Sequence, residues 1–139
     1  MTVLSGTLEF ATTSDTDVLD VTSEAAEFVQ ASQIRDGILV AFTPGATAGI
    51  TTIEFESGAV SDFKRALEAV APRDQEYEHN QRWGDGNGYS HVRAALIGPS
   101  LTVPVRDGRL DLGTWQQIVL CDFDNRPRRR CLTLQVLGV

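Results

Sequence analysis

Lysine, cysteine and long apolar runs are scarce in this sequence of 139 residues. Because the longest apolar runs span only a few residues, no segment is suited to cross a membrane. Cys121 and Cys131 are too few for a disulfide framework and match no C-x-x-C motif, so we expect two buried thiols in strands. The first residues lack the basic and apolar segments of a secretory signal, which makes the cytoplasm the expected compartment.

Basic charge is scarce in the first part of the chain. Lys64 is the single lysine, and 19 acidic against 12 basic residues give a net charge of −7. Nine acidic residues and one basic residue, Arg35, give residues 1–60 a charge of −8. A negative surface repels phosphate backbones, so we expect no nucleic-acid partner. The one concentrated basic run, residues 125–130, holds four arginines, which suffices for a phosphate or a pyrophosphate.

Hydrophobic patterning predicts an α+β fold, a single domain over residues 1–139 with a mainly antiparallel, sandwich-like β core and two to three helices. Thr22 or Ser23 is expected to cap one helix, apolar spacing predicts another over residues 59–70, and residues 91–97 suit a helix turn or a strand. Alternating or β-branched segments predict strands at 5–12, which 17–21 extend, and at 38–42, 50–55, 101–105, 110–112, 115–124 and 129–136.

Two turns are expected to join strands near the carboxyl end. Asp107 and Gly108 supply the positive φ angles of a tight hairpin turn, and a second hairpin is expected around residues 125–127. Pro104 cannot donate a ladder hydrogen bond, so it restricts its strand to a sheet edge or a bulge.

A long polar segment, residues 73–89, carries the first candidate for chemistry. Its length and glycine content are typical of functional loops. His79 and His91 bracket it together with Asp85 and Asn87, and Trp83 within it is suited to stack on a flat ring. A histidine in this setting acts as a metal ligand, as a general acid or base, or as a surface donor. The spacing matches no fixed metal-binding pattern, so these alternatives stay open.

Two charged sets elsewhere admit both a functional and a structural interpretation. Glu54 and Glu56 lie two residues apart on an expected strand, where they would share a face and serve either as a carboxylate pair or as a solvated surface. Arg128 and Arg130 lie in the arginine run, where they would either clamp an anion from one side or belong to a solvated hairpin tip.

Five segments of the chain resemble the YjbQ family, also called the secondary thiamine-phosphate synthase family. They are residues 77–80, 91–105, 107–110, 112–117 and 128–130, and the likeness runs from about Gly37 to the carboxyl end. The resemblance implies an α+β fold with a β-sandwich-like core and a small cytosolic protein that assembles as a homotrimer or a hexamer. It also implies weak synthesis of thiamine phosphate, in which a pyrimidine diphosphate loses pyrophosphate and is captured by a thiazole phosphate.

The resemblance also implies the site residues. The family has a cluster of three histidines, of which this chain keeps His79 and His91 and replaces the third by Gly45. A divalent metal, zinc or magnesium, is expected on the two remaining histidines, with Glu54 as a further ligand. The expected catalytic residues are His79, His91 and Glu54. The residues expected to bind substrate or phosphate are Asn80, Asp85, Asn87, Arg93, Arg128 and Arg130.

Three hypotheses about function follow. The first is a thiamine-phosphate synthase-type transferase. The second is an oligomeric protein that binds a small phosphorylated molecule or a metal without turning it over. The third is an assembly protein whose shared motifs only shape turns and subunit contacts. The polar segment with both histidines speaks against the third, because interfaces prefer apolar anchors to a sequence such as Asp-Gly-Asn-Gly.

Overall fold

Two antiparallel sheets form the frame of the protein, for which a computed structural model describes residues 1–14 and 16–139. The first sheet is a curled half-barrel of five strands in the order β1 (Thr2–Ala11), β8 (Arg129–Gly138), β3 (Gly37–Phe42), β5 (Ser100–Arg106) and β6 (Arg109–Leu110). The second has the order β2 (Asp17–Asp20), β7 (Gln117–Asp122) and β4 (Ala48–Ile53). The predicted α+β fold with two antiparallel layers is confirmed.

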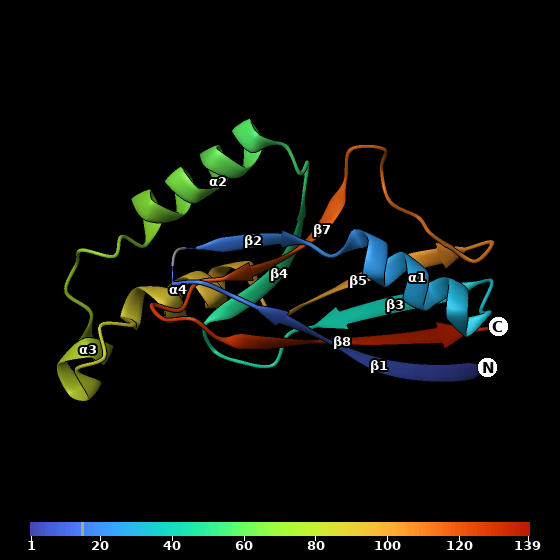
Figure 1. The fold of residues 1–139 in the computed structure, drawn as a ribbon, viewed down its shortest axis with the longest axis horizontal. Coiled ribbons are helices and arrows are strands. Elements are labelled where there is room, and N and C mark those ends of the chain that lie inside the picture. Colours follow the sequence, from blue (N-terminus) through green and yellow to red (C-terminus); the bar gives the residue numbers. More distant parts are fainter. Residues whose placement is uncertain (15) are drawn as a thin grey trace.

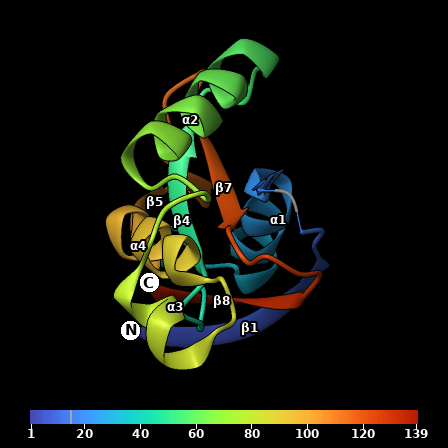
Figure 2. The ribbon, with the colours of Figure 1, turned by 90° about the vertical axis from the view of Figure 1, so that its left-hand side faces the viewer.

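Four helices connect and cover these sheets. They are α1 (Thr22–Ser32), α2 (Ser57–Val70), α3 (Glu78–Trp83) and α4 (Gly88–Ile97). Figures 1 and 2 show β1 and β8 along the lower border of the molecule and α2 at the upper end. The two chain ends lie side by side, since Thr2 and Gly138 are register partners. None of the helices in the described ranges is long and apolar enough to cross a membrane.

The central strand β7 joins two hydrophobic cores. Ile118 and Leu120 face the five-stranded sheet and α1, whereas Val119 and Cys121 face the side that α2 and α4 cover. Because both faces of β7 are buried, its sequence is continuously apolar instead of alternating. Burial raises the pKa of the Cys121 thiol to about 12, so this thiol is inert at neutral pH. Both cysteines lie in strands as predicted, although Cys131 is only half-buried.

The hairpin between β5 and β6 is confirmed. Asp107 and Gly108 have φ angles of 52° and 76°, which is the left-handed pair that a tight primed turn needs. β6 pairs only with Val105 and Arg106, and beyond its end one hydrogen bond, from the Asp111 amide to the Pro104 carbonyl at 2.9 Å, continues along this side of β5 near the sheet edge. This is the edge position that its missing N–H requires.

The second expected hairpin is wrong. β7 and β8 lie in different sheets, since β7 pairs with β2 and β4 while β8 pairs with β1 and β3. The segment 123–128 carries the chain from one layer to the other. Within it Asp124 is buried and accepts from Arg128, whereas residues 125–127 are exposed.

Three boundaries also differ from the sequence prediction. The strand predicted to reach residue 55 ends at Ile53. The polar segment contains α3 and the start of α4. The first helix is capped by neither expected residue. Its N-cap is Val21, and the Thr22 hydroxyl donates to Asp20 and accepts a hydrogen bond from the Ile118 amide.

A close backbone approach between β3 and β8 yields a testable prediction. A methyl group added at Gly37 would lie 2.1 Å from the carbonyl oxygen of Leu137. We expect Gly37→Ala to lower the free energy of unfolding by about 2 to 3 kcal/mol, because the backbone has to shift to relieve the overlap. Urea unfolding followed by circular dichroism measures the change.

Gly113→Ala is the matched control. Its added methyl group would meet the Gln116 side chain at an ordinary distance of 3.5 Å, and we expect a change below about 0.5 kcal/mol. Equal effects of the two substitutions would contradict the account of the β3–β8 contact.

Candidate functional site

The two histidines lie against each other on neighbouring helices. His79 belongs to α3 and His91 to the first turns of α4, and their ring centroids are 4.4 Å apart with the planes tilted by 55°. Gly84 and Gly86 have φ angles of 66° and 67°, a conformation that lets the chain reverse between the helices. The polar segment therefore folds so that both rings meet, although 11 residues separate them in the sequence.

A hydrogen bond assigns the ring proton of His91. The Nδ1 atom of His91 lies 2.9 Å from the carbonyl oxygen of Ala46. Because a carbonyl oxygen only accepts, Nδ1 carries the proton, and in the neutral ring the lone pair is on Nε2. The Nδ1 atom of His79 lies 3.4 Å from Oδ1 of Asp85, a carboxylate that also only accepts. The Nδ1 atom of His79 is nevertheless buried without a hydrogen-bond partner in the described part of the chain, so only the ring of His91 has its Nδ1 proton held by a hydrogen bond and its Nε2 left for another partner.

Three polar side chains that were predicted to bind substrate hold the turn between α3 and α4. Asn80 Oδ1 accepts a hydrogen bond from the Gly88 amide at 2.8 Å, and Asp85 Oδ1 accepts one from the Asn87 amide at 3.1 Å. Asn87 is buried, and its Oδ1 accepts from the Ser90 hydroxyl and from the Asn125 amide. By holding this turn, the three polar side chains set the relative position of α3 and α4 and so of the two histidines. The binding of a substrate by Asn80, Asp85 and Asn87 stays a prediction.

Arg128 and Arg130 point to the same side. The anions that they bind are two aspartates of the same chain, Asp124 and Asp122. Arg128 Nε donates to Oδ2 of Asp124 at 3.0 Å. Arg130 Nε donates to Oδ1 of Asp122 at 2.6 Å, and its side chain is 9% exposed. The cluster of these four residues, which we call the ionic cluster, has no formal net charge. The cluster therefore offers a ligand no surplus positive charge.

The two carboxylates of the ionic cluster differ in pKa. Burial raises the pKa of Asp122 above its ordinary value, and the opposing contribution of Arg130 does not offset it. Oδ2 of Asp122 is buried without a hydrogen-bond partner in the described part of the chain, which fits the raised pKa. Burial also acts on Asp124, but hydrogen bonds from Thr47 and Arg128 outweigh it and hold the pKa of Asp124 below its ordinary value.

The ionic cluster also holds the loop that contacts His91. The Thr47 hydroxyl donates to Oδ2 of Asp124 at 3.0 Å and accepts from the Arg130 guanidinium. The amide of Phe123 donates to the Thr47 carbonyl at 2.9 Å. Ala46, whose carbonyl accepts from His91, precedes Thr47 directly. A continuous series of contacts therefore leads from the buried ion pairs to the imidazole of His91.

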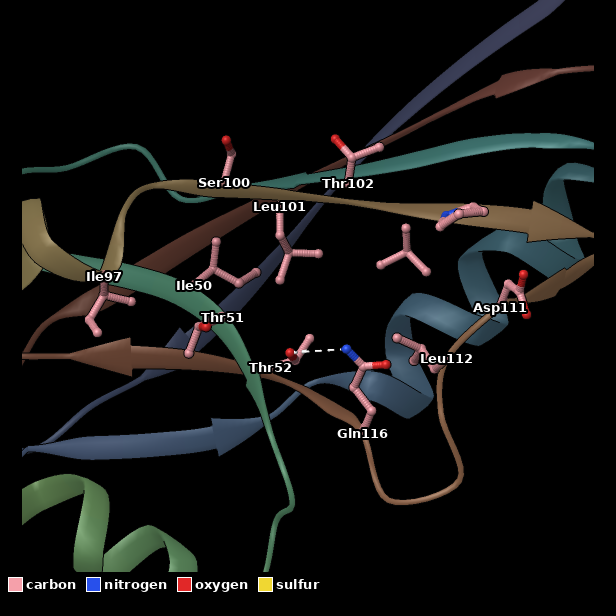
Figure 3. A pocket seen from close by; sticks show the side chains of 12 residues that line it. Ile50, Thr51, Thr52, Ile97, Ser100, Leu101, Thr102, Asp111, Leu112 and Gln116 are labelled. Carbon is pink, nitrogen blue, oxygen red and sulfur yellow. Dashed lines mark hydrogen bonds between the residues drawn. The ribbon is translucent and has the colours of Figure 1, made fainter.

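A small cavity of about 240 Å³ adjoins His91. Its walls are short side chains, and it is lined by Gly45, Ala46, Ala48, His91, Ala94, Ala95 and Pro99. Another cavity, of about 300 Å³, lies between β4 and β5 and is shown in Figure 3, where Gln116 donates to Thr52. Neither histidine lines that second cavity, so the cavity beside His91 is the one next to the candidate chemistry.

Arg93 was predicted to hold phosphate, and its guanidinium is enclosed instead. It lies two residues after His91, so it projects from the opposite side of α4. Its Nη2 donates to Glu68 at 2.6 Å and its Nε to the Ala71 carbonyl at 2.9 Å, and the side chain is 2% exposed. Arg93 ties α4 to α2, and within one chain it is not available to a ligand at the histidine pair.

Glu54 does not lie near the histidines within one chain. β4 begins next to the loop that contacts His91 and ends at Ile53, and at about 3.3 Å per residue its far end is about 20 Å away. The expected shared strand face of Glu54 and Glu56 is wrong, because both residues follow the end of β4. Glu56 caps α2, where its carboxylate accepts from the amides of Gly58 and Ala59.

A metal ion finds too few ligands here. No group of three or more His, Cys, Asp or Glu side chains in the described ranges is arranged to hold one. A catalytic zinc site needs three protein ligands, and the histidine pair supplies two. Gly45, which stands where the family has its third histidine, has a φ of 137°, which disfavours a residue with a side chain. Zinc or magnesium stays a prediction from the resemblance, and no step below depends on it.

Sequence reasoning missed three residues of the site: Thr47, Asp122 and Asp124. The signal was present, because two aspartates at the end of an apolar strand face two arginines four and eight residues later. Buried carboxylates need charged partners, so this spacing indicates internal ion pairs. The prediction of a hairpin at this point obscured that pattern.

The ionic cluster yields a testable prediction on stability. We expect Asp124→Asn to lower the free energy of unfolding at pH 7 by about 2 to 3 kcal/mol, because it removes the buried carboxylate that accepts from Thr47 and Arg128 and leaves two arginines beside the single carboxylate of Asp122. The pKa of Asp124 is lowered in the folded state, so its contribution is present above its ordinary pKa of 3.8 and is lost as the pH falls through the folded value. The gap between wild type and variant should therefore shrink in acid.

Asp107→Asn serves as the control for this measurement. It breaks the Arg35–Asp107 pair, whose side chains are 67% and 76% exposed, and we expect a loss below about 1 kcal/mol. Urea unfolding over a pH series measures both variants. A loss for Asp124→Asn as small as that for Asp107→Asn would contradict the role of the cluster.

Comparisons with known proteins identify the relatives of this chain. A family model described as UPF0047 protein YjbQ-like matches residues 6–139. A UPF0047 protein of Methanothermobacter thermautotrophicus is 40% identical over 138 residues, which cover 99% of this chain and 94% of the relative. The UPF0047 protein YugU of Bacillus subtilis is 35% identical over 133 residues, 95% of this chain and 98% of the relative.

Solved structures extend the likeness to the fold. The crystal structure of a hypothetical protein from Aeropyrum pernix has a TM-score of 0.91 at 31% identity and covers 98% of this chain and 99% of that chain. A YbjQ-like protein of unknown function from Sulfolobus solfataricus has a TM-score of 0.89 at 27% identity, over 99% of this chain and 100% of that chain. The resemblance noted in the sequence is confirmed, and the chain belongs to the YjbQ-like UPF0047 family.

Proposed function

We propose that this chain is an enzyme that acts on a small phosphorylated molecule at the pair of His79 and His91. The reaction we assign is the formation of thiamine phosphate from a pyrimidine diphosphate and a thiazole phosphate. The observation that carries the proposal is the contact of the two imidazole rings, 4.4 Å apart, beside a small cavity. Two imidazoles with Nε2 directed away from their internal partners are suited to exchange protons or hydrogen bonds with a substrate.

The bond changes in this reaction balance without a further reactant. The C–O bond between the pyrimidine methylene and the diphosphate breaks, and the diphosphate leaves with the electron pair. The ring nitrogen of the thiazole phosphate then supplies the pair for the new C–N bond. Catalysis of such a step needs positioned donors for the departing anion and a site that orients the two rings.

The residues of the site divide these tasks. His79, whose Nδ1 faces Asp85, donates a hydrogen bond from Nε2 to the departing diphosphate in its protonated form. His91 accepts a hydrogen bond from the substrate through Nε2, because Nδ1 is already bonded to Ala46. Trp83 is 67% exposed at the end of α3 and offers a face for stacking on an aromatic ring.

Arg126 supplies the cation that the ionic cluster does not. It follows Asn125, whose side chain donates to the Asp85 carbonyl at 2.8 Å, so it begins beside the histidine pair. Arg126 is exposed and makes no ion pair within the part of the chain that the structure describes. A guanidinium in this state is free to bind a diphosphate.

The first test is formation of thiamine phosphate by the purified chain. We expect His91→Ala to lower kcat by about 100-fold or more, since a positioned acid or base typically contributes that factor. Asp107→Asn serves as the control. Asp107 lies in the turn between β5 and β6 and pairs with Arg35, so this variant should retain wild-type turnover. Wild-type turnover no faster than that of His91→Ala would overturn the proposal.

The second test separates Arg126 from its neighbour. We expect Arg126→Ala to raise KM for the diphosphate substrate about tenfold, the effect of losing one hydrogen bond to a charged group. Arg129→Ala is the matched control, because Arg129 already pairs with Glu9 at 2.7 Å. Steady-state kinetics measure both, and equal KM values for the two variants would refute the role of Arg126.

The alternative is a protein that binds the phosphorylated molecule without turning it over. The cavity beside His91 favours a binding protein, because its short, apolar walls supply no further catalytic group. Calorimetric titration with pyrophosphate distinguishes the two. Binding that requires both histidines, together with no turnover, would favour the binding protein.

A further inference from the structure

The cavity between β4 and β5 is separate from the histidine pair and takes no part in the reaction assigned above. Its volume is about 300 Å³, which is at the lower end of the range for pockets that hold small molecules. Figure 3 shows it between the two sheets, with the loop that carries Leu112 and Gln116 along one side. We call this cavity the sheet cleft.

β4 and β5 are linked at one end of the sheet cleft and separate along it. At the near end the Ile50 amide donates to the Gly98 carbonyl at 2.9 Å. At the far end the Asp111 amide donates to the Pro104 carbonyl at 2.9 Å, and a proline has no N–H to offer. Between these points the two strands do not pair with each other, since β4 pairs with β7 and β5 with β3. A short stretch of each strand edge is therefore left open.

Two backbone groups of β5 are neighbours on this open stretch. Successive residues of a strand direct their N–H and C=O groups to opposite edges. The carbonyl of Pro99 bonds toward β3, whereas those of Gly98 and Pro104 bond on the other edge, so the backbone groups of Ser100 and Thr102 face the sheet cleft. β6 ends before it reaches them. The Ser100 carbonyl and the Thr102 N–H therefore lie on one edge, and no hydrogen bond in the described ranges reaches either group.

The inner wall of the sheet cleft is apolar. Ile50, Leu101 and Leu112 point into the cleft in Figure 3, and they belong to the main core or pack against it. Asp111, the charged residue among those that line the cleft, is paired with Arg106 at 3.1 Å. The sheet cleft therefore offers a ligand an apolar surface and hydrogen bonds, and it offers no net charge.

These features define the class of ligand. A backbone acceptor and a backbone donor on one edge are complementary to a flat ring that carries an N–H next to a C=O, as the edges of nucleobases do. A cyclic amide has this arrangement, because its ring holds the amide in the cis form. The trans amide of an open chain directs the same two groups to opposite sides. A neutral ring of this kind also places its apolar face on the wall without bringing a charge out of water.

The open stretch is too short for an added peptide strand. Residues 100–102 span about 10 Å at the rise of a β-strand, whereas strands commonly have five or six residues. Pro104 has no N–H to continue a ladder, and its carbonyl is already bonded to Asp111. A small molecule therefore fits the sheet cleft better than an extended peptide.

We propose that the sheet cleft is a binding site for a small planar cyclic amide, held between the Ser100 carbonyl and the Thr102 N–H of β5. The proposal is independent of the reaction assigned above, because neither histidine lines this cleft. It is tested with 2-pyridone, a flat ring with one N–H beside one C=O, by NMR titration of the full, isotope-labelled chain. We expect the Thr102 amide proton to shift downfield and to saturate, while the amide of His91 keeps its position.

Two matched controls remove one hydrogen bond each. N-methyl-2-pyridone keeps the ring and the carbonyl but has no N–H, and we expect it to bind about tenfold more weakly. Thr102→Pro removes the N–H that faces the sheet cleft and spares the ladder to β3, as Pro104 does on the same edge. We expect this variant to bind 2-pyridone about tenfold more weakly, whereas Thr102→Val, which keeps the N–H, should bind as wild type does.

Several results would overturn the proposal. They are equal binding of the two ring compounds, or a Thr102 amide that does not shift with 2-pyridone. A third is a shift of this amide with a linear peptide, acetyl-trialanine amide, in the absence of any shift with 2-pyridone. If Thr102→Pro does not fold, the wild-type titrations with the two ring compounds decide the result. Binding of 2-pyridone by a chain that forms no thiamine phosphate would support this site and contradict only the reaction assigned above.

Discussion

Four charged side chains meet where β7 ends and β8 begins, and the arrangement of the candidate site follows from their pairing. Asp122 and Asp124 are removed from water, which is costly for a carboxylate unless a cation and hydrogen bonds compensate for the lost hydration. Arg128 and Arg130 provide that compensation from the next strand. Because the pairs have to form, the chain crosses between the two sheets at this point and cannot close into a hairpin.

The same pairing determines what the site offers a ligand. It fixes Thr47, and through the adjoining Ala46 carbonyl it fixes the proton on His91. It also neutralises two of the four arginines that make the segment appear basic in the sequence. Positive charge for a ligand therefore comes from exposed residues of the run, such as Arg126, while the buried members serve the fold. A count of charges along the chain does not make that distinction.

Patterns that depend on neighbouring residues were readable from the sequence. The turn at Asp107 and Gly108 and the strands near it follow from local geometry, and the contact of His79 with His91 agrees with their place around one glycine-rich segment. Glu54 and Arg93 were misplaced because their surroundings are set by distant elements. The end of β4 separates Glu54 from the histidines, and the side of α4 that meets Glu68 of α2 buries Arg93. Neither fact is encoded in local spacing.

The conformation of Gly45 bears on the third histidine that the resemblance implies at this position. Its φ of 137° suits glycine, and a side chain added there would begin 3.3 Å from Nη1 of Arg130. The loop is thus closed over the buried arginine and directs the Ala46 carbonyl to His91. In a loop that carried a third histidine, the backbone at this position would need another conformation, and the contact with His91 would change with it. The backbone at Gly45 and the ionic cluster therefore act together to position the carbonyl that holds the Nδ1 proton of His91.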